Sequence, residues 1–203
     1  MMYATHKVGG AFAALLGFEI MRQNGMLDTD IEPWCQLLVM YPACSFGSTL
    51  PDLDHIWNNV KEKTPFNWLI HKLIHITNPK HRSWQTHSLL VTGGMLALLY
   101  SLVYALDVFR WFDISGFSLL LIKLLSIGLG FGVASHLILD SFTRAGIWLF
   151  PGVKIRLVPD SPVFSTDTKY EKVWRVVLYI ATTLMLIWVL NPFGLQSIFT
   201  GGA

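Results

Sequence analysis

Three apolar segments constrain this chain more than any other feature, because each is long enough to cross a lipid bilayer. They cover residues 88–106, 117–139 and 173–193. A bilayer core of about 30 Å needs roughly 20 residues of helix. Two shorter apolar segments, residues 8–21 and 34–50, contain the small residues that let helices pack closely in a membrane. We therefore expect an all-α membrane protein with about five transmembrane helices in a single domain, residues 1–203.

The composition supports a membrane protein and excludes several other classes. Apolar residues make up 53% of the chain and charged residues only 14%, against about a quarter charged in soluble domains. A net charge of +2 is too small for nucleic-acid binding by bulk basic charge. Both cysteines, Cys35 and Cys44, lie in one apolar segment, which excludes a secreted disulfide scaffold.

The charges of the loops predict the orientation of the chain. Residues 51–87 and 140–172 each carry five Lys or Arg residues, whereas residues 22–33 and 107–116 each carry one, together with acidic residues. Loops rich in Lys and Arg remain on the cytoplasmic side of a membrane. We therefore expect a multi-pass protein with its N-terminus and both long loops in the cytoplasm.

Four short clusters of histidine and aspartate lie at the ends of the expected spans. They contain His6; Asp52, Asp54 and His55; His87; and His136 with Asp140. The orientation inferred from the loops places all four clusters at the cytoplasmic membrane boundary, although that inference made no use of the histidines. Ionisable residues near membrane depth are costly and are functional by default. The sequence therefore predicts one shared polar site at this boundary.

The residue types and spacings in these clusters suit a divalent metal ion. His136 and Asp140 are i and i+4 on a helix, so they project from one face. Imidazole nitrogen combined with carboxylate oxygen suits zinc, manganese or iron better than calcium or magnesium. Seven ligands exceed the needs of one tetrahedral ion, and two ions bridged by a carboxylate would use them better. We expect one or two ions, zinc or manganese.

Each residue also has a simpler explanation. A histidine in a membrane protein often forms a hydrogen bond between helices, which is our interpretation of His71 and His75. Either Asp52 or Asp54 alone would serve as a turn residue, and Arg144 would by default face lipid phosphates. These explanations suffice singly, but they do not explain four clusters on one side of the membrane.

Taken in order, the clusters resemble the YdjM-type family of bacterial inner-membrane proteins, which are regarded as metal-dependent hydrolases. The resemblance covers roughly residues 5–159. It is carried by Thr5-His6, Leu50-Pro51-Asp52-Leu53-Asp54-His55, His81-Arg82 through Thr86-His87-Ser88, Ser135-His136 through Asp140, Thr143-Arg144-Ala145-Gly146 and residues 156–159. The resemblance implies a bacterial inner-membrane location and metal ligands at His6, Asp52, Asp54, His55, His87, His136 and Asp140. A more distant similarity to zinc-dependent phospholipases C suggests a phosphodiester substrate by analogy only.

One segment departs from the family pattern. The family usually has His-Arg-Gly-x-Thr-His-Ser, whereas here Ser-Trp-Gln separates Arg82 from Thr86. The glycine is missing and one residue is added, which would turn His81 by about 100° relative to His87 in a helix. We therefore expect His87 to be a ligand and His81 to form a hydrogen bond with a ligand or with substrate.

These features favour a membrane-bound metal-dependent hydrolase that acts at the level of the lipid headgroups. Metal-activated water would be the nucleophile, and Asp54 or Asp52 the general base. Arg82, Arg144 and Arg156 are suited to hold an anionic group, because guanidinium matches phosphate geometry. The expected partner is membrane lipid, with a lipid-linked phosphate as substrate and no nucleic acid. The sequence does not decide the oligomeric state.

Two other functions compete with hydrolysis. A divalent-metal transporter would use the same ligand types, but transporter sites usually lie near the bilayer midplane and often show repeat symmetry. A non-catalytic membrane protein stabilised by metal would bind the ion without turnover. Separately, residues 147–162 predict an interfacial turn and a short extended segment that places Lys154 and Arg156 near headgroups. The alternative for this segment is a plain surface loop.

Overall fold

The computed structural model describes residues 3–52, 83–109, 115–157 and 168–190. Its elements are, in chain order, α1 (Tyr3–Gln23), α2 (Pro33–Gly47), the 3-10 turn η1 (Leu50–Asp52), α5 (Leu89–Phe109), α6 (Gly116–Ser141), β1 (Ile147–Phe150), β2 (Val153–Ile155) and α7 (Lys169–Leu190). The α-helices of the described part coincide with the five apolar segments of the sequence.

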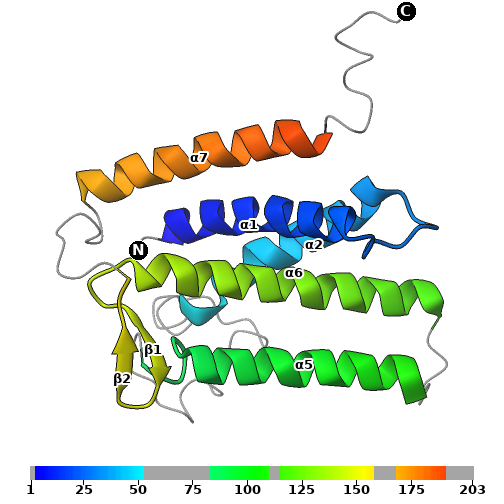
Figure 1. Cartoon of the computed structure of the whole chain (residues 1–203), viewed down its shortest axis with the longest axis horizontal. Helices are drawn as coiled ribbons and strands as arrows, with labels where there is room; N and C mark the ends of the chain where they lie inside the picture. Colours follow the sequence, from blue (N-terminus) through cyan, green and yellow to red (C-terminus); the bar gives the residue numbers. More distant parts are fainter. Residues whose placement is uncertain (1–2, 53–82, 110–114, 158–167, 191–203) are drawn as a thin grey trace, which may run out of the picture.

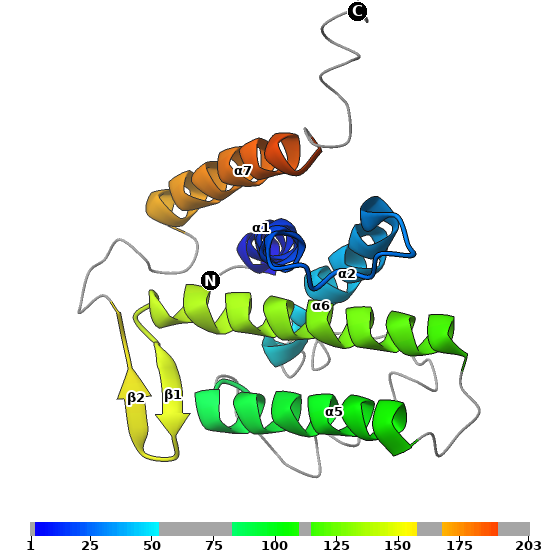
Figure 2. The same ribbon diagram turned by 45° about the vertical axis from the view of Figure 1, so that its right-hand side comes forward.

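The helices form a bundle around α6, as Figures 1 and 2 show from two directions. Helix α6 contacts α1, α2 and α5, and α7 packs against α1. The apolar interior lies where α1, α2 and α6 meet, and its buried side chains include Phe18, Met40 and Leu124. The three central helices therefore provide the rigid frame, with α5 and α7 on its two sides.

Helices α5, α6 and α7 are each long and apolar enough to cross a membrane. Helices α5 and α7 expose large apolar side chains, among them Leu98 and Leu184, which is the arrangement expected of surfaces that face lipid. Helix α2 has 15 residues, or about 22 Å, which is shorter than the bilayer core. Of the five expected spans, three thus meet the requirements of length and composition, and those in α1 and α2 remain predictions.

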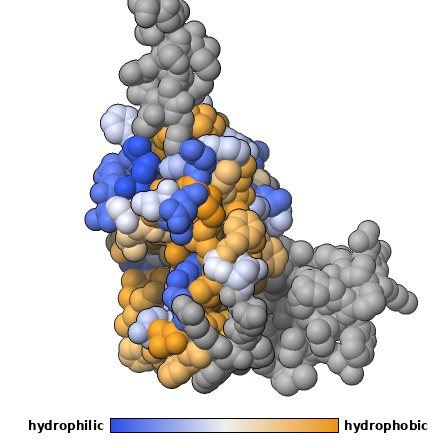
Figure 3. Space-filling view, turned by 90° about the vertical axis from the view of Figure 1, so that its right-hand side faces the viewer, coloured by the Kyte–Doolittle hydropathy of each residue, from blue (hydrophilic) through white to orange (hydrophobic). Residues whose placement is uncertain are grey.

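The end of the bundle where α1 finishes and α6 begins is polar. Gln23, Asn24, Asp28 and Asp30 are exposed there. Figure 3 looks at this end and shows hydrophilic residues gathered together, with a hydrophobic surface below them. Polar residues are expected at the end of a helical bundle where the chain leaves the bilayer core.

Glycines let α1, α2 and α6 approach one another closely at Ser48, the residue that caps α2. A Cβ atom on Gly132 of α6 would lie 2.7 Å from the Ser48 nitrogen and would overlap the Cys44 carbonyl oxygen. A Cβ atom on Gly10 of α1 would lie 2.5 Å from Ser48 Oγ. Because backbone atoms cannot move aside as a side chain can, the contact at Gly132 requires glycine.

A short antiparallel hairpin follows α6, with Ile147 paired to Ile155. Gly146 begins the hairpin with a φ of 64°, a left-handed conformation that favours glycine. The Lys154 ammonium lies 4.5 Å from the centre of the Trp148 ring. The structure confirms the extended segment expected here as far as it is described, and residues 158–162 lie outside the described part.

The contact at Gly132 makes a testable difference to stability. We expect Gly132→Ala to lower the free energy of unfolding by about 1–3 kcal/mol, because a methyl group there forces the backbones of α2 and α6 apart. The measurement is thermal unfolding of the purified chain in detergent, followed by circular dichroism.

Gly93→Ala is the matched control, since a Cβ atom on Gly93 of α5 would meet nothing within 4 Å. We expect it to be neutral or to stabilise by about 0.5–1 kcal/mol, because alanine favours helix. Equal destabilisation by the two substitutions would contradict the close crossing described here.

Candidate metal centre

Five of the seven expected ligands meet at one end of the bundle. His6 lies in the first turns of α1, Asp52 ends η1, and His87 lies two residues before the first residue of α5. His136 and Asp140 lie in the last two turns of α6. In Figure 1 this is the left-hand end, where α1 and α5 begin and α6 ends. Segments up to 134 positions apart in the sequence therefore contribute to one cluster.

The side-chain atoms of the cluster are as close as ligands of one ion. Oxygens of Asp140 lie 3.4 Å from His6 Nε2, 3.5 Å from His87 Nε2 and 3.6 Å from His136 Nε2. Oxygens of Asp52 lie 3.8, 3.4 and 3.9 Å from the same three nitrogens. Ligand atoms of a tetrahedral zinc ion lie about 3.3–3.6 Å apart, as its bond lengths dictate. The arrangement therefore fits a bound divalent ion.

The orientation of His136 is fixed by the end of α2. Its Nδ1 donates a hydrogen bond of 2.7 Å to the carbonyl oxygen of Ser48. A carbonyl oxygen only accepts, so the proton of the neutral ring lies on Nδ1 and the lone pair of Nε2 faces the cluster. Ligating histidines are commonly oriented by such a bond from the other ring nitrogen. His136 is thus preset as a ligand.

His87 and His6 are held in different ways. His87 Nδ1 forms a 2.9 Å hydrogen bond with Thr86 Oγ1, and its Nε2 lies 3.4 Å from Nε2 of His136. The ring of His6 stacks on the ring of His136, with centroids 3.8 Å apart and an angle of 17° between the planes. All three Nε2 atoms consequently point into the space between Asp52 and Asp140.

The burial of this cluster costs free energy unless a cation is bound. His6, His87, His136 and Asp140 are fully buried, and Asp52 is 7% exposed. Within the described part, both ring nitrogens of His6 and Oδ1 of Asp52 have no hydrogen-bond partner. A buried polar group without a partner costs about 1–3 kcal/mol. A divalent ion would compensate for these groups together.

The charge state of Asp52 suits a ligand. Burial alone would raise the pKa of Asp52, but the histidines around it, His87 foremost, favour the ionised form and lower the pKa to about 2. The carboxylate is therefore ionised at neutral pH, as metal binding requires.

The ligands divide into two overlapping groups. One comprises His6, His136 and Asp140, and the other comprises Asp52, His87 and His136. Either group could hold a metal ion. Since Nδ1 of His136 is bonded to Ser48, this residue has one nitrogen left for a metal. Because both groups would use this one nitrogen, they overlap in a single site.

Several expected site residues do not join the described cluster. Asp54, His55 and Arg82 lie outside the described residues, as do His71, His75 and His81. Arg144 follows α6 and Arg156 follows β2, and both side chains are exposed. The sequence did not point to Ser48, which acts through its backbone, or to Glu171 and Arg175 of α7, which contact Thr5. Glu171 and Arg175 could have been predicted from the sequence, because they are a carboxylate and a guanidinium spaced i, i+4 at the start of an apolar helix.

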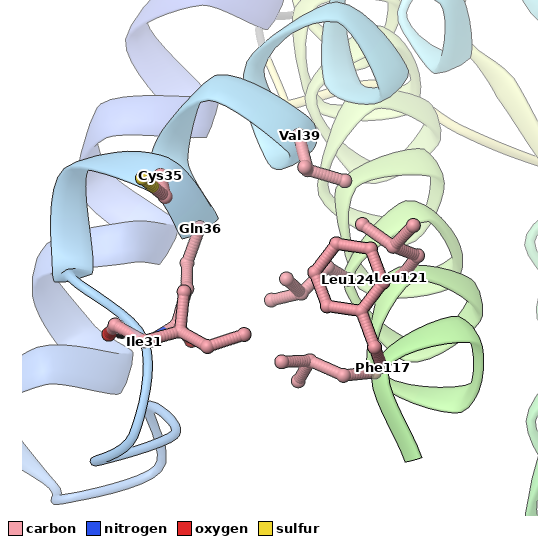
Figure 4. Close-up of a pocket in the computed structure, with 8 residues that line it drawn as sticks. Ile31, Cys35, Gln36, Val39, Phe117, Leu121 and Leu124 are labelled. Carbon is pink, nitrogen blue, oxygen red and sulfur yellow. Dashed lines mark hydrogen bonds between the residues drawn. The ribbon is translucent and has the colours of Figure 1, made fainter. Parts of the chain in front are cut away.

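An apolar pocket lies far from this cluster, between the beginnings of α2 and α6. Figure 4 shows Val39, Phe117 and Leu124 around it. The amide of Gln36, also at its edge, forms hydrogen bonds with the backbone of Asp28 and Ile31. The pocket therefore offers apolar surface rather than groups suited to catalysis.

Comparison with known proteins agrees with this structure. The model of the YdjM inner membrane protein family matches residues 1–194. No curated protein and no solved structure matches the chain. The match covers α1, α2, α5, α6 and α7, including the three helices that are long and apolar enough to cross a membrane. The chain is a membrane protein and belongs to the YdjM inner membrane protein family.

Proposed function

We propose that this protein is a membrane-bound metal-dependent hydrolase with one divalent ion in the described cluster. The single observation that carries the proposal is the convergence of three imidazole Nε2 atoms on two buried carboxylates, with separations of 3.4–3.9 Å. The residues that would hold the ion are His6, Asp52, His87, His136 and Asp140. A second ion would need Asp54 or His55, which lie outside the described residues.

The ligand chemistry favours zinc or manganese. Three imidazoles and two carboxylates form a mixed nitrogen and oxygen set, which suits these ions better than calcium or magnesium. Cys44 is not part of the set, since its sulfur forms a 3.1 Å hydrogen bond with the Gly10 carbonyl oxygen. Cys35 lies near the start of α2, at the other end of the bundle.

The residues around the ion would have distinct roles in hydrolysis. A bound ion supplies activated water and polarises a phosphoryl or carbonyl oxygen. Asp52 is the most exposed of the five ligands, so we assign it to the side from which substrate approaches. The proton acceptor would be Asp54 or Asp52. Arg82, Arg144 and Arg156 are proposed to bind the anionic part of the substrate.

The position of the cluster supports a substrate at the membrane surface. The ligands lie where α6 ends and α5 begins, and the ends of spanning helices reach the headgroup region. The positive residues of the neighbouring loops favour the cytoplasmic side. We therefore propose a lipid phosphoester or lipid-linked phosphate as substrate, which would not need to leave the bilayer.

A non-catalytic, metal-stabilised protein is the second candidate, and the burial of the cluster favours it. Four of the five ligands are fully buried, as in structural metal sites, which have no open position for water. A transporter is less favoured, because transport sites usually lie near the midplane, whereas this cluster lies at one end of the bundle.

Metal content tests the site directly. We expect the chain, purified in detergent and supplied with zinc or manganese, to retain about one ion per chain. His136→Ala and Asp52→Ala should each weaken binding by more than about 100-fold, since loss of a ligand exceeds the 10–100-fold typical of groups behind ligands. Elemental analysis after dialysis is the measurement.

The control for metal content is Asp28→Ala, which removes an exposed carboxylate at the opposite end of α1. This variant should bind metal like the wild type. Unchanged metal content in both His136→Ala and Asp52→Ala would show that the ligands are assigned wrongly.

Turnover tests the reaction class. We expect the metal-loaded protein to hydrolyse phosphodiester lipids or simple phosphoesters in mixed micelles, and chelator to abolish the activity. His136→Ala should reduce turnover at least 100-fold, because it loses the ion that activates water. Release of phosphate or headgroup is measured. A fully loaded protein without turnover on any of these substrates would favour the metal-stabilised alternative.

A further inference from the structure

A second buried polar cluster lies between the first turn of α1 and the start of α7. Thr5 Oγ1 donates a 2.9 Å hydrogen bond to Glu171 Oε1, and Arg175 Nε donates a 3.2 Å hydrogen bond to Thr5 Oγ1. Thr5 is fully buried and Glu171 is 1% exposed. The hydroxyl thus joins a carboxylate and a guanidinium that stand at i and i+4 on α7.

Packing of α7 does not by itself require this cluster. Apolar contacts between the helices are supplied by Leu178, Val8 and Leu139, with Trp174 against them. Burying a carboxylate is costly unless it is paired and hydrogen-bonded. Because apolar packing already joins the helices, we infer that the charged groups of Glu171 and Arg175 fix the position of the first turn of α1 relative to α7.

This cluster lies next to the candidate metal centre, because Thr5 directly precedes His6. His136 and His87 are oriented through their Nδ1 atoms by Ser48 and Thr86. His6 differs, since within the described part its Nδ1 has no hydrogen-bond partner. Its placement therefore depends on the backbone of the first turn of α1 and on stacking against His136.

We propose that Glu171 and Arg175 are positioning residues for the metal site. Through the hydroxyl of Thr5 they hold the first turn of α1 against α7, and this places Nε2 of His6 toward Asp140. The inference rests on the proposed metal site and adds α7, which contributes none of the five described ligands, to its support.

The other end of α1 provides a matched comparison. Glu19 is 4% exposed and accepts hydrogen bonds from Arg22 and from Nε1 of Trp188 on α7, at 2.7 and 3.2 Å. It is thus a second buried carboxylate at the contact of α1 with α7. Along the helix it lies about 20 Å from His6, too far to affect the position of that ligand directly.

The test compares metal binding by full-length variants in detergent. Zinc affinity is measured by competition with a chelating dye, and the visible absorption of bound cobalt(II) reports the geometry of the ligands. We expect Glu171→Gln and Thr5→Val to weaken zinc binding about tenfold, within the range known for groups behind ligands, and to change the cobalt spectrum. Thr5→Ser should behave as the wild type, because it keeps the hydroxyl.

The variant Glu19→Gln distinguishes an effect on the position of His6 from a general loss of protein stability. It should lower the melting temperature while leaving zinc affinity and the cobalt spectrum unchanged. If Glu171→Gln does not fold, Thr5→Val and Thr5→Ser still decide the matter, since neither alters a charge. Unchanged zinc binding in Thr5→Val, or equal weakening by Glu19→Gln and Glu171→Gln, would overturn the inference. A wild-type chain that binds neither zinc nor cobalt overturns the proposed function, and this inference with it.

Discussion

The hydrogen bond from His136 to the Ser48 carbonyl oxygen is the interaction on which the candidate site depends. It joins α6, which carries two of the ligands, to Ser48 at the end of α2, four residues before Asp52. The same bond directs the lone pair of His136 toward the cluster. It is possible only because Gly132, one turn earlier on α6, allows the two backbones to approach. Close helix packing and ligand orientation therefore have a common origin.

Much of this arrangement follows from the sequence, for identifiable reasons. Apolar length predicted the helices, and loop charge predicted that His6, Asp52, His87 and His136 lie on one side of the membrane. The beginning of α1 was missed, because the polar residues before residue 8 look like a flank. In the structure the helix begins at Tyr3, and Thr5 in its first turn is hydrogen-bonded to Glu171 of α7. Such contacts leave no local pattern in a sequence.

The hairpin illustrates the same limit. An extended segment after residue 146 was predictable from its alternation of apolar and basic residues, but its role was not. The backbone nitrogen of Trp148 donates a 2.9 Å hydrogen bond to the carbonyl oxygen of His87, and Ser88 Oγ donates to the Leu149 carbonyl oxygen at 3.2 Å. These bonds fix the start of α5 and, with it, His87. Because one of them is made entirely by backbone atoms, residue types do not reveal it.

The three histidines are therefore placed by three separate parts of the chain: the end of α2, the hairpin and α7. An ion bound between them would link the four segments that carry the five ligands, which are the start of α1, η1, the residues just before α5 and the end of α6. Its binding energy would then also be folding energy, because the ligands converge only in the folded chain. For the same reason, a residue outside the cluster should alter metal affinity where it holds a segment close to its ligand, as Thr5 does beside His6. On this proposal, contacts outside the cluster would set the positions of the ligands and, through them, the affinity for the ion.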